Sequence, residues 1–174
     1  MTSRARQVVL FGAPAAAAVV NMSHPIVMPP IYDAVLHHMP WWIVLHVVNL
    51  VLFPMVGLAA YLLVRGREDR AAKISRVAIA CFVPLYAAFD SLAGIGTGVL
   101  VQQTSLITPG DPSAVGAVID GYWQSPVLLG VATAGSVAWV IAMLAAAVSF
   151  SEPSIRRRAA IVAVAILPVT GFAR

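Results

Sequence analysis

WWIVLHVVNLVLFPMVGLAAYLLV, residues 41–64, contains no Asp, Glu, Lys or Arg, and the chain turns basic directly after it at Arg65. The hydrocarbon core of a bilayer is about 30 Å thick, and a helix of about 20 residues crosses it. Tryptophan favours the membrane interface, so Trp41 and Trp42 indicate an anchor at one end of this helix. The stretch therefore predicts a membrane-spanning helix over residues 41–64.

Four other apolar stretches lie on either side of it. Residues 77–101 carry Asp90 as their single charge, and residues 126–150 carry none. Residues 8–22 predict a first span, although a basic start, a short apolar run and small residues also describe a signal peptide. Residues 159–173 cover only about 22 Å as a helix, so we expect a short or truncated fifth span there.

The basic residues alternate with these stretches. They gather in three clusters, at Arg4 and Arg6, at residues 65–76 and at residues 156–158, whereas residues 21–41 and 102–124 contain no Lys or Arg. Cytoplasmic loops of membrane proteins carry an excess of Lys and Arg, which predicts a cytoplasmic N-terminus. We expect an all-α, polytopic transmembrane bundle of four to five spans, forming one membrane domain over residues 1–174 in the plasma (inner) membrane.

Composition excludes a soluble domain. Hydrophobic residues make up 60% of the chain and charged residues 10%, whereas soluble domains carry about 25% charged residues. A sequence pI near 9.8 would suit a nucleic-acid partner, but these basic residues flank apolar stretches and face anionic lipid headgroups. We therefore expect a lipid bilayer with anionic headgroups at the cytoplasmic face as the partner, and no nucleic acid. A homo- or hetero-oligomer stays open.

Small residues indicate how the helices pack. Helices in lipid associate through small side chains that allow close approach. Such residues recur at four-residue spacing in the third and fourth stretches: Gly94 and Gly98, then Gly130, Ala134 and Ala138, with Ala142 and Ala146 continuing the series. We expect the third and fourth spans to pack against each other through these faces.

Two prolines lie inside predicted spans, Pro54 in the second and Pro84 in the third. Each removes a backbone N–H and crowds the carbonyl four residues earlier, so we expect kinks at both. Helix breaks often mark a site in transporters. Prolines are also common in ordinary membrane helices, so the two positions do not by themselves indicate function.

The most informative polar residues are Asp90, His46 and Asn49. A charge at mid-span costs about 3 kcal/mol on insertion scales, so Asp90 must face protein or water rather than lipid. His46 and Asn49 are three residues apart and share one helix face. Counted from the ends of their helices, all three lie at similar depth, so antiparallel neighbours would bring them together. We predict a polar site of these three residues.

Several functions fit such a site. The first is a structural contact or a small-molecule-binding bundle, since polar pairs set helix register. The second is a proton- or ion-coupled transporter, or a subunit of one, that uses the Asp–His pair. A lipid-modifying membrane enzyme is a third, although no activated nucleophile or second acid–base pair accompanies the site.

No cofactor is expected. Two histidines on facing spans are needed to hold haem, and His46 is the single histidine placed inside a predicted span. His37 and His38, with Asp33 and His24 in the same loop, are weak candidates for a divalent metal. Adjacent side chains on a helix point in different directions, so we expect no metal there.

The loop between the third and fourth spans contains a signal of its own. Asp111 followed by Pro112 is typical of an N-cap and first helical position. We therefore expect a short helix over residues 113–123 that lies at the interface, with Trp123 at headgroup depth.

Three strings together resemble a group of bacterial integral membrane proteins without an assigned activity. They are His46 with FPMVG at 53–57, YAAFDSLAGIGTG at 86–98 and YWQSP at 122–126. The resemblance spans about residues 40–150. It implies a helical inner-membrane bundle in which the His and the Asp recur, and it implies no activity.

Overall fold

The computed structural model describes residues 1–107 and 113–150, and its regular elements in these ranges are all helical. This confirms the all-α prediction for the described chain. The fifth stretch, 159–173, lies outside the described residues. In chain order the elements are α1 (Ser3–Gln7), the π-helical η1 (Val8–Gly12), α2 (Ala13–Met22), α3 (Ile31–His37), α4 (Trp41–Val64), α5 (Arg70–Phe89), the π-helical η2 (Asp90–Gly96), α6 (Thr97–Ile107), α7 (Ser113–Trp123) and α8 (Pro126–Ser149).

Four continuous helical stretches are long and apolar enough to cross a membrane, as the sequence predicts: Ser3–Met22, Trp41–Val64, Arg70–Ile107 and Ser113–Ser149. The third and fourth extend beyond the predicted bounds. A helix of 38 residues is about 57 Å long, nearly twice the thickness of a bilayer core. One end of the molecule therefore has helical structure in excess of what a crossing requires.

Side-chain hydrogen bonds cap the N-termini of two central helices, α5 and α8. The Asp69 side chain accepts a hydrogen bond from the backbone N–H of Ala72 at 2.9 Å and caps α5. The Ser125 hydroxyl accepts from the N–H of Leu128 at 3.3 Å, and Pro126 follows at the first helical position of α8. Both arrangements satisfy N–H groups that have no partner within their own helix.

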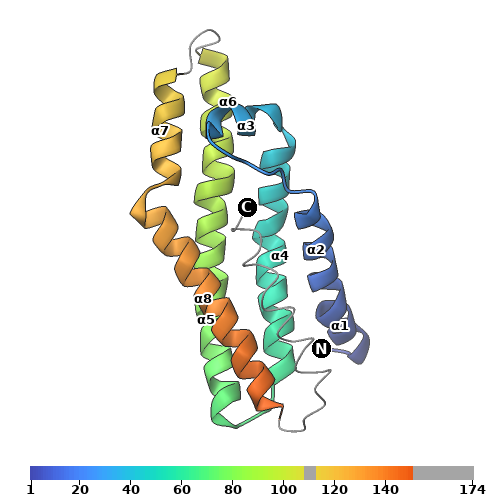
Figure 1. The fold of residues 1–174 in the computed structure, drawn as a ribbon. Helices are drawn as coiled ribbons and strands as arrows, with labels where there is room; N and C mark the ends of the chain where they lie inside the picture. The colour runs from blue at the N-terminus through green and yellow to red at the C-terminus, as the bar shows by residue number, and fades with distance from the viewer. Residues whose placement is uncertain (108–112, 151–174) are drawn as a thin grey trace.

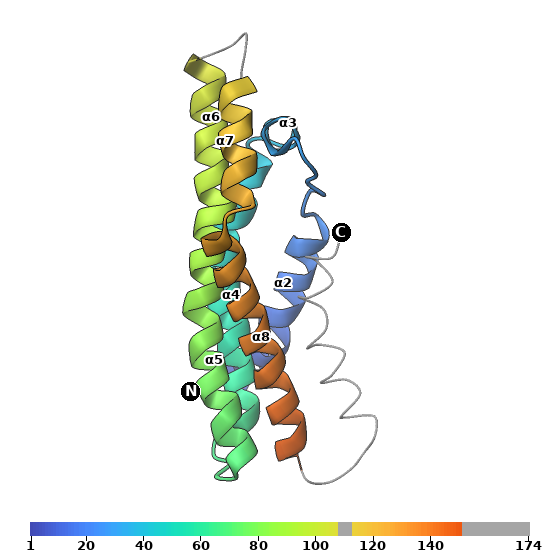
Figure 2. The same cartoon turned by 60° about the vertical axis from the view of Figure 1, so that its left-hand side comes forward.

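The centre of the bundle is formed by α4, α5 and α8, and α2 lies along α4 (Figure 1). In the first view α8 crosses in front of α5, and in the second view the two helices lie beside each other (Figure 2). Pro54 and Pro84 both sit inside helices that continue through them. The departure from α-helical geometry begins farther on, at Asp90.

The prediction that small residues at four-residue spacing join the third and fourth spans needs correction. Gly94 and Gly98 face α4 rather than α8: an added Cβ would lie 2.2 Å from the His46 ring at Gly94 and 2.7 Å from Ile43 at Gly98. On α8, Gly130 has nothing within 4 Å of an added Cβ, and Ala134 is exposed.

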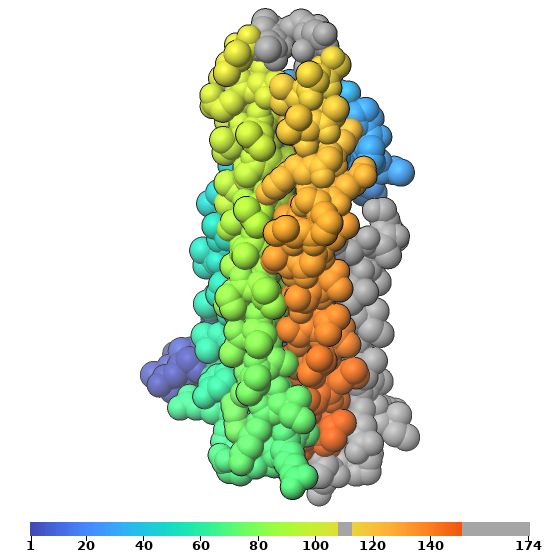
Figure 3. Space-filling model, turned by 90° about the vertical axis from the view of Figure 1, so that its left-hand side faces the viewer, coloured from blue at the N-terminus to red at the C-terminus, as the bar shows by residue number. Residues whose placement is uncertain are grey.

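The face of α8 that contacts α5 contains Gly135, Ala138, Ala142 and Ala146, all of which are buried. Three residues of the predicted series, Ala138, Ala142 and Ala146, thus lie in the interface. The reason is the helical repeat, because a four-residue step advances by about 40° around a helix with 3.6 residues per turn. A long four-residue series therefore leaves the contact face. A space-filling view shows α5 and α8 in close contact along this interface (Figure 3).

Three elements form what we call the cap: α3, α6 and α7. Ile31, Tyr32, Val35, Trp42, Val101 and Ile119 form its buried apolar cluster. The Asp120 carboxylate on α7 accepts from the backbone N–H of Ile31 at 2.8 Å and ties α3 in place. The helix predicted over 113–123 is present, but it runs beside α6 (Figure 1).

Candidate functional site

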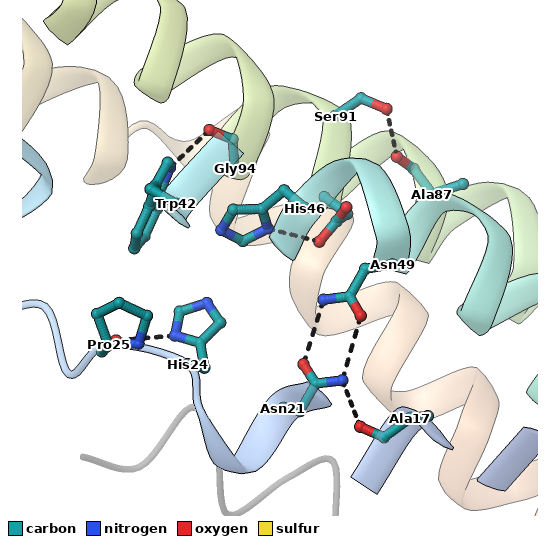
Figure 4. Close-up of polar contacts among 11 residues, drawn as sticks. Ala17, Asn21, His24, Pro25, Trp42, His46, Asn49, Ala87, Ser91 and Gly94 are labelled. Carbon is teal, nitrogen blue, oxygen red and sulfur yellow. Dashed lines mark hydrogen bonds and ion pairs between the residues drawn. The ribbon is translucent and has the colours of Figure 1, made fainter. Parts of the chain in front are cut away.

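The candidate site centres on His46 of α4 and Asp90, the first residue of η2. Their side chains are 8% and 5% exposed, and His46 Nδ1 lies 2.8 Å from Asp90 Oδ1 (Figure 4). With Asp90 ionised, its carboxylate only accepts hydrogen bonds, and Nδ1 of His46 is then the donor. The structure therefore brings together two of the three residues that the sequence singles out.

The backbone around Asp90 is specialised for this contact. Residues Asp90–Gly96 are π-helical, a geometry that is rare and frequent at functional sites. Gly94 supplies the space for the imidazole, because any side chain there would overlap the His46 ring. The Gly94 carbonyl accepts a 2.8 Å hydrogen bond from the indole N–H of Trp42. Together these contacts hold η2 close to α4.

Asn49, the third predicted residue, bonds to a different partner. Its amide makes two reciprocal hydrogen bonds of 3.2 Å with Asn21 of α2. Asn21 also donates to the Ala17 carbonyl at 2.8 Å. The pair fastens α2 to α4 beside the site, so Asn49 positions the N-terminal helix and does not bond to Asp90.

His24 is a site residue that sequence reasoning placed only in the loop. Its ring lies 5.2 Å from the ring of His46 and 5.3 Å from that of Trp42, measured between centroids. His24 Nδ1 donates to the Pro25 carbonyl at 2.8 Å, and burial lowers the pKa of the His24 imidazole. No periodic pattern could have located it, since residues 23–30 form no regular element.

Two polar atoms of the site are buried and make no hydrogen bond within the described part of the chain, His46 Nε2 and Asp90 Oδ2. With Nδ1 protonated in both histidines, Nε2 of His46 and Nε2 of His24 are lone-pair acceptors. An ionised Asp90 also offers only acceptors. The open positions of the site therefore suit a hydrogen-bond donor or a cation.

The weak metal candidates in the loop do not assemble. His37 and His38 are neighbours at the end of α3, with ring centroids 5.1 Å apart, while His24 packs against His46 instead. Among residues 1–107 and 113–150, no group of three or more His, Cys, Asp or Glu side chains is arranged to hold a metal. Asp33 belongs to no such group.

No protein-family model, curated protein or solved structure matches this chain. The resemblance to bacterial integral membrane proteins stays a prediction. Any functional assignment therefore rests on the residues and contacts of the bundle itself.

Proposed function

We propose that this chain is a multi-span protein of the bacterial plasma membrane, with its N-terminus in the cytoplasm. The proposal is supported by four helices of sufficient length and hydropathy and by basic residues gathered on alternate connections, at residues 4–6 and 65–76. In this orientation the cap and His24 face outward, and the turn between α4 and α5 faces the cytoplasm.

Within that bundle, the function best supported is an ion-coupled transporter, or a subunit of one, with its cation site at Asp90 and His46. The observation that carries it is the buried carboxylate–imidazole pair with an unpartnered acceptor on each side chain. Intramembrane ionisable residues typically mark ion pathways.

Energetics favour a cation over a self-contained pair. Each buried polar atom left without a partner costs about 1–3 kcal/mol. A purely structural ion pair is stable in a core only when its remaining lone pairs are also satisfied. Two open acceptors beside one negative charge form a site that a bound cation would stabilise.

The surroundings of the site differ on its two sides. Toward the cap, the loop 23–30 covers the site through His24, whose ring packs against that of His46. Toward the opposite end, Phe53, Phe82 and Tyr86 pack with ring centroids 4.7–5.1 Å apart. This aromatic layer lies on the proposed cytoplasmic side of the site, so we expect the cation to exchange with the outside.

A second candidate, a structural bundle, is supported by other contacts. The Asn21–Asn49 pair and the bond from Trp42 to the Gly94 carbonyl join helices without leaving a group open. In that case the Asp90–His46 contact sets helix register.

Purified protein in liposomes separates the two. Fluxes of H⁺, Na⁺ and K⁺ are measured for the wild type, Asp90→Asn and His46→Gln, with the detergent stability of each. His37→Gln is the matched control, since His37 is exposed at the end of α3. A cation-coupled function predicts that flux is lost in the two site variants while the fold is retained. Absence of flux in the wild type, with Asp90→Asn unfolding, would contradict it and favour the structural role.

A further inference from the structure

We infer that the cation bound at this site is a transition-metal ion of the Zn²⁺, Co²⁺ or Cu class, held by Nε2 of His24 and Nε2 of His46, with Asp90 supporting His46. This inference rests on the proposed cation site and names its ligand. It is carried by the hydrogen bonds of the two imidazoles and by the buried Nε2 of His46, which has no partner among the described residues.

Both rings are held in the same tautomer. His46 Nδ1 faces the Asp90 carboxylate, and His24 Nδ1 faces the Pro25 carbonyl, each at 2.8 Å. Both partners are acceptors, so both Nδ1 atoms carry protons and both Nε2 atoms present lone pairs. A metal-binding histidine almost always donates its other N–H to a carboxylate or a backbone carbonyl, and the two rings show one case of each.

The spacing of the rings fits one shared ion. A nitrogen ligand lies 2.0–2.1 Å from zinc, and two imidazoles at the tetrahedral angle then have centroids about 5 Å apart. The observed separation is 5.2 Å, with the ring planes at 83°. His37 and His38 have nearly the same separation, 5.1 Å, so the spacing permits a shared ion and the buried, open nitrogen of His46 distinguishes this pair. Figure 4 shows the unbonded nitrogen of His24 on the ring edge nearer His46. His46 Nε2 is buried and has no partner among the described residues.

The donor type selects the class of ion. Imidazole nitrogens suit Zn, Cu, Fe and Ni, whereas Mg²⁺ and Ca²⁺ favour oxygen ligands. The described chain supplies two nitrogens and no third His, Cys, Asp or Glu ligand. Structural zinc sites have four protein ligands. A site with two keeps positions open for water or another ligand, which suits an ion that is taken up and released.

The test uses full-length, untagged protein in detergent. Zn²⁺ binding is measured by calorimetry, and Co²⁺ is titrated as a spectroscopic probe whose absorption reports nitrogen ligation. His24→Gln is the main variant, because His24 lies in the connection between α2 and α3, outside the long helices. His46→Gln and Asp90→Asn complete the set, and the double variant His37→Gln, His38→Gln is the matched control.

One ion per chain is expected in the wild type. His24→Gln and His46→Gln should each weaken binding at least about tenfold, and Asp90→Asn about 10- to 100-fold, as for other outer-shell partners. The control should bind like the wild type. Unchanged affinity in His24→Gln, or an equal loss in the His37, His38 control, would overturn the inference.

The outcome also separates this inference from the proposed function. Flux of H⁺, Na⁺ or K⁺ that requires Asp90, without binding of Zn²⁺ or Co²⁺, would contradict the metal inference and support the proposed transporter. Metal binding that requires His24, without flux of H⁺, Na⁺, K⁺ or Zn²⁺ in the same liposomes, would support the metal site and contradict the transport role.

Discussion

The long helix Arg70–Ile107 has two interfaces of opposite character. Against α8 it is apolar and closely packed, with Phe82 and Tyr86 lying over Gly135 and the buried alanines that follow it. Against α4 it is apolar over its first half, where Gly57 lies against Ile79 and Val83. Farther along, the α4 contact is polar, with the Asp90–His46 contact and the Trp42–Gly94 hydrogen bond. The polar part leaves two ionisable side chains with open buried atoms.

The apolar interface contains one inter-helical hydrogen bond of note, from the Ser75 hydroxyl to the Ala142 carbonyl at 2.8 Å. The Ser75 hydroxyl is thereby satisfied. The indole nitrogen of Trp139, in the same apolar interface, is buried without a partner among the described residues. The polar interface differs because its two open atoms, His46 Nε2 and Asp90 Oδ2, belong to an ionisable pair. The face toward α8 therefore contributes packing, and the face toward α4 holds the proposed cation site. We expect variants on the two faces to affect stability and cation binding separately.

The largest effect is expected from Gly94→Ala. The new Cβ would lie 2.2 Å from the buried His46 ring, so the ring or the helix must move. We expect a loss of about 1–3 kcal/mol in unfolding free energy from overpacking, together with loss of cation binding. Gly130→Ala is the control, since nothing lies within 4 Å of its added Cβ. Equal behaviour of the two variants in detergent unfolding would contradict the geometry at Gly94.

Ala142→Leu should break the other interface alone. Ala142 is fully buried between α5 and α8, so a larger side chain should cost about 1–3 kcal/mol and leave metal affinity per folded molecule unchanged. Ala134→Leu tests the same helix at an exposed position and should be neutral. Loss of cation affinity in folded Ala142→Leu protein would show that the two faces are not separate.

A smaller effect is expected at the edge of the polar interface. Inter-helical hydrogen bonds in membranes contribute about 0.6 kcal/mol on average. A double-mutant cycle with Asn21→Ala and Asn49→Ala should give a coupling energy of that size, because the two amides bond to each other. Strict additivity of the two single variants would mean that the pair does not fasten α2 to α4.

The smallest effect at neutral pH concerns Asp69, outside both interfaces. The hydrogen bond from the Ala72 N–H, then that from the Ser149 hydroxyl, lowers the pKa of Asp69 below its ordinary value of 3.8. The folded state therefore binds fewer protons, and this contribution is present above the unfolded pKa and lost as pH falls through the folded one. Acid unfolding should show this step in the wild type, and Asp69→Asn should lack it.

The sequence was sufficient for the spans and for part of the site. Uninterrupted apolar stretches predict helices without knowledge of their neighbours, and four long helices are present. Equal depth in antiparallel helices was enough to pair His46 with Asp90. The helical extension to Ile107 was missed, because Gln102 and Gln103 have the composition of a loop although a helix can continue into water.

The remaining features depend on tertiary contacts that no local pattern encodes. Spacing tells which residues share a helix face but not which neighbour that face meets, so Gly94 and Gly98 were assigned to the wrong partner. His24 was missed because its position depends on how the loop folds back over α4. The π-helical turn at Asp90 leaves no signature in hydropathy.

The central claim is that His46 and His24 present bare Nε2 atoms to a cation at the polar interface. ¹⁵N NMR of protein labelled at histidine measures this directly, before and after addition of Zn²⁺. The account predicts Nδ1–H tautomers for both residues, with Nε2 resonances that shift on adding the metal, while His37 and His38 stay unchanged. A protonated Nε2 on His46, or shifts confined to His37 and His38, would contradict it.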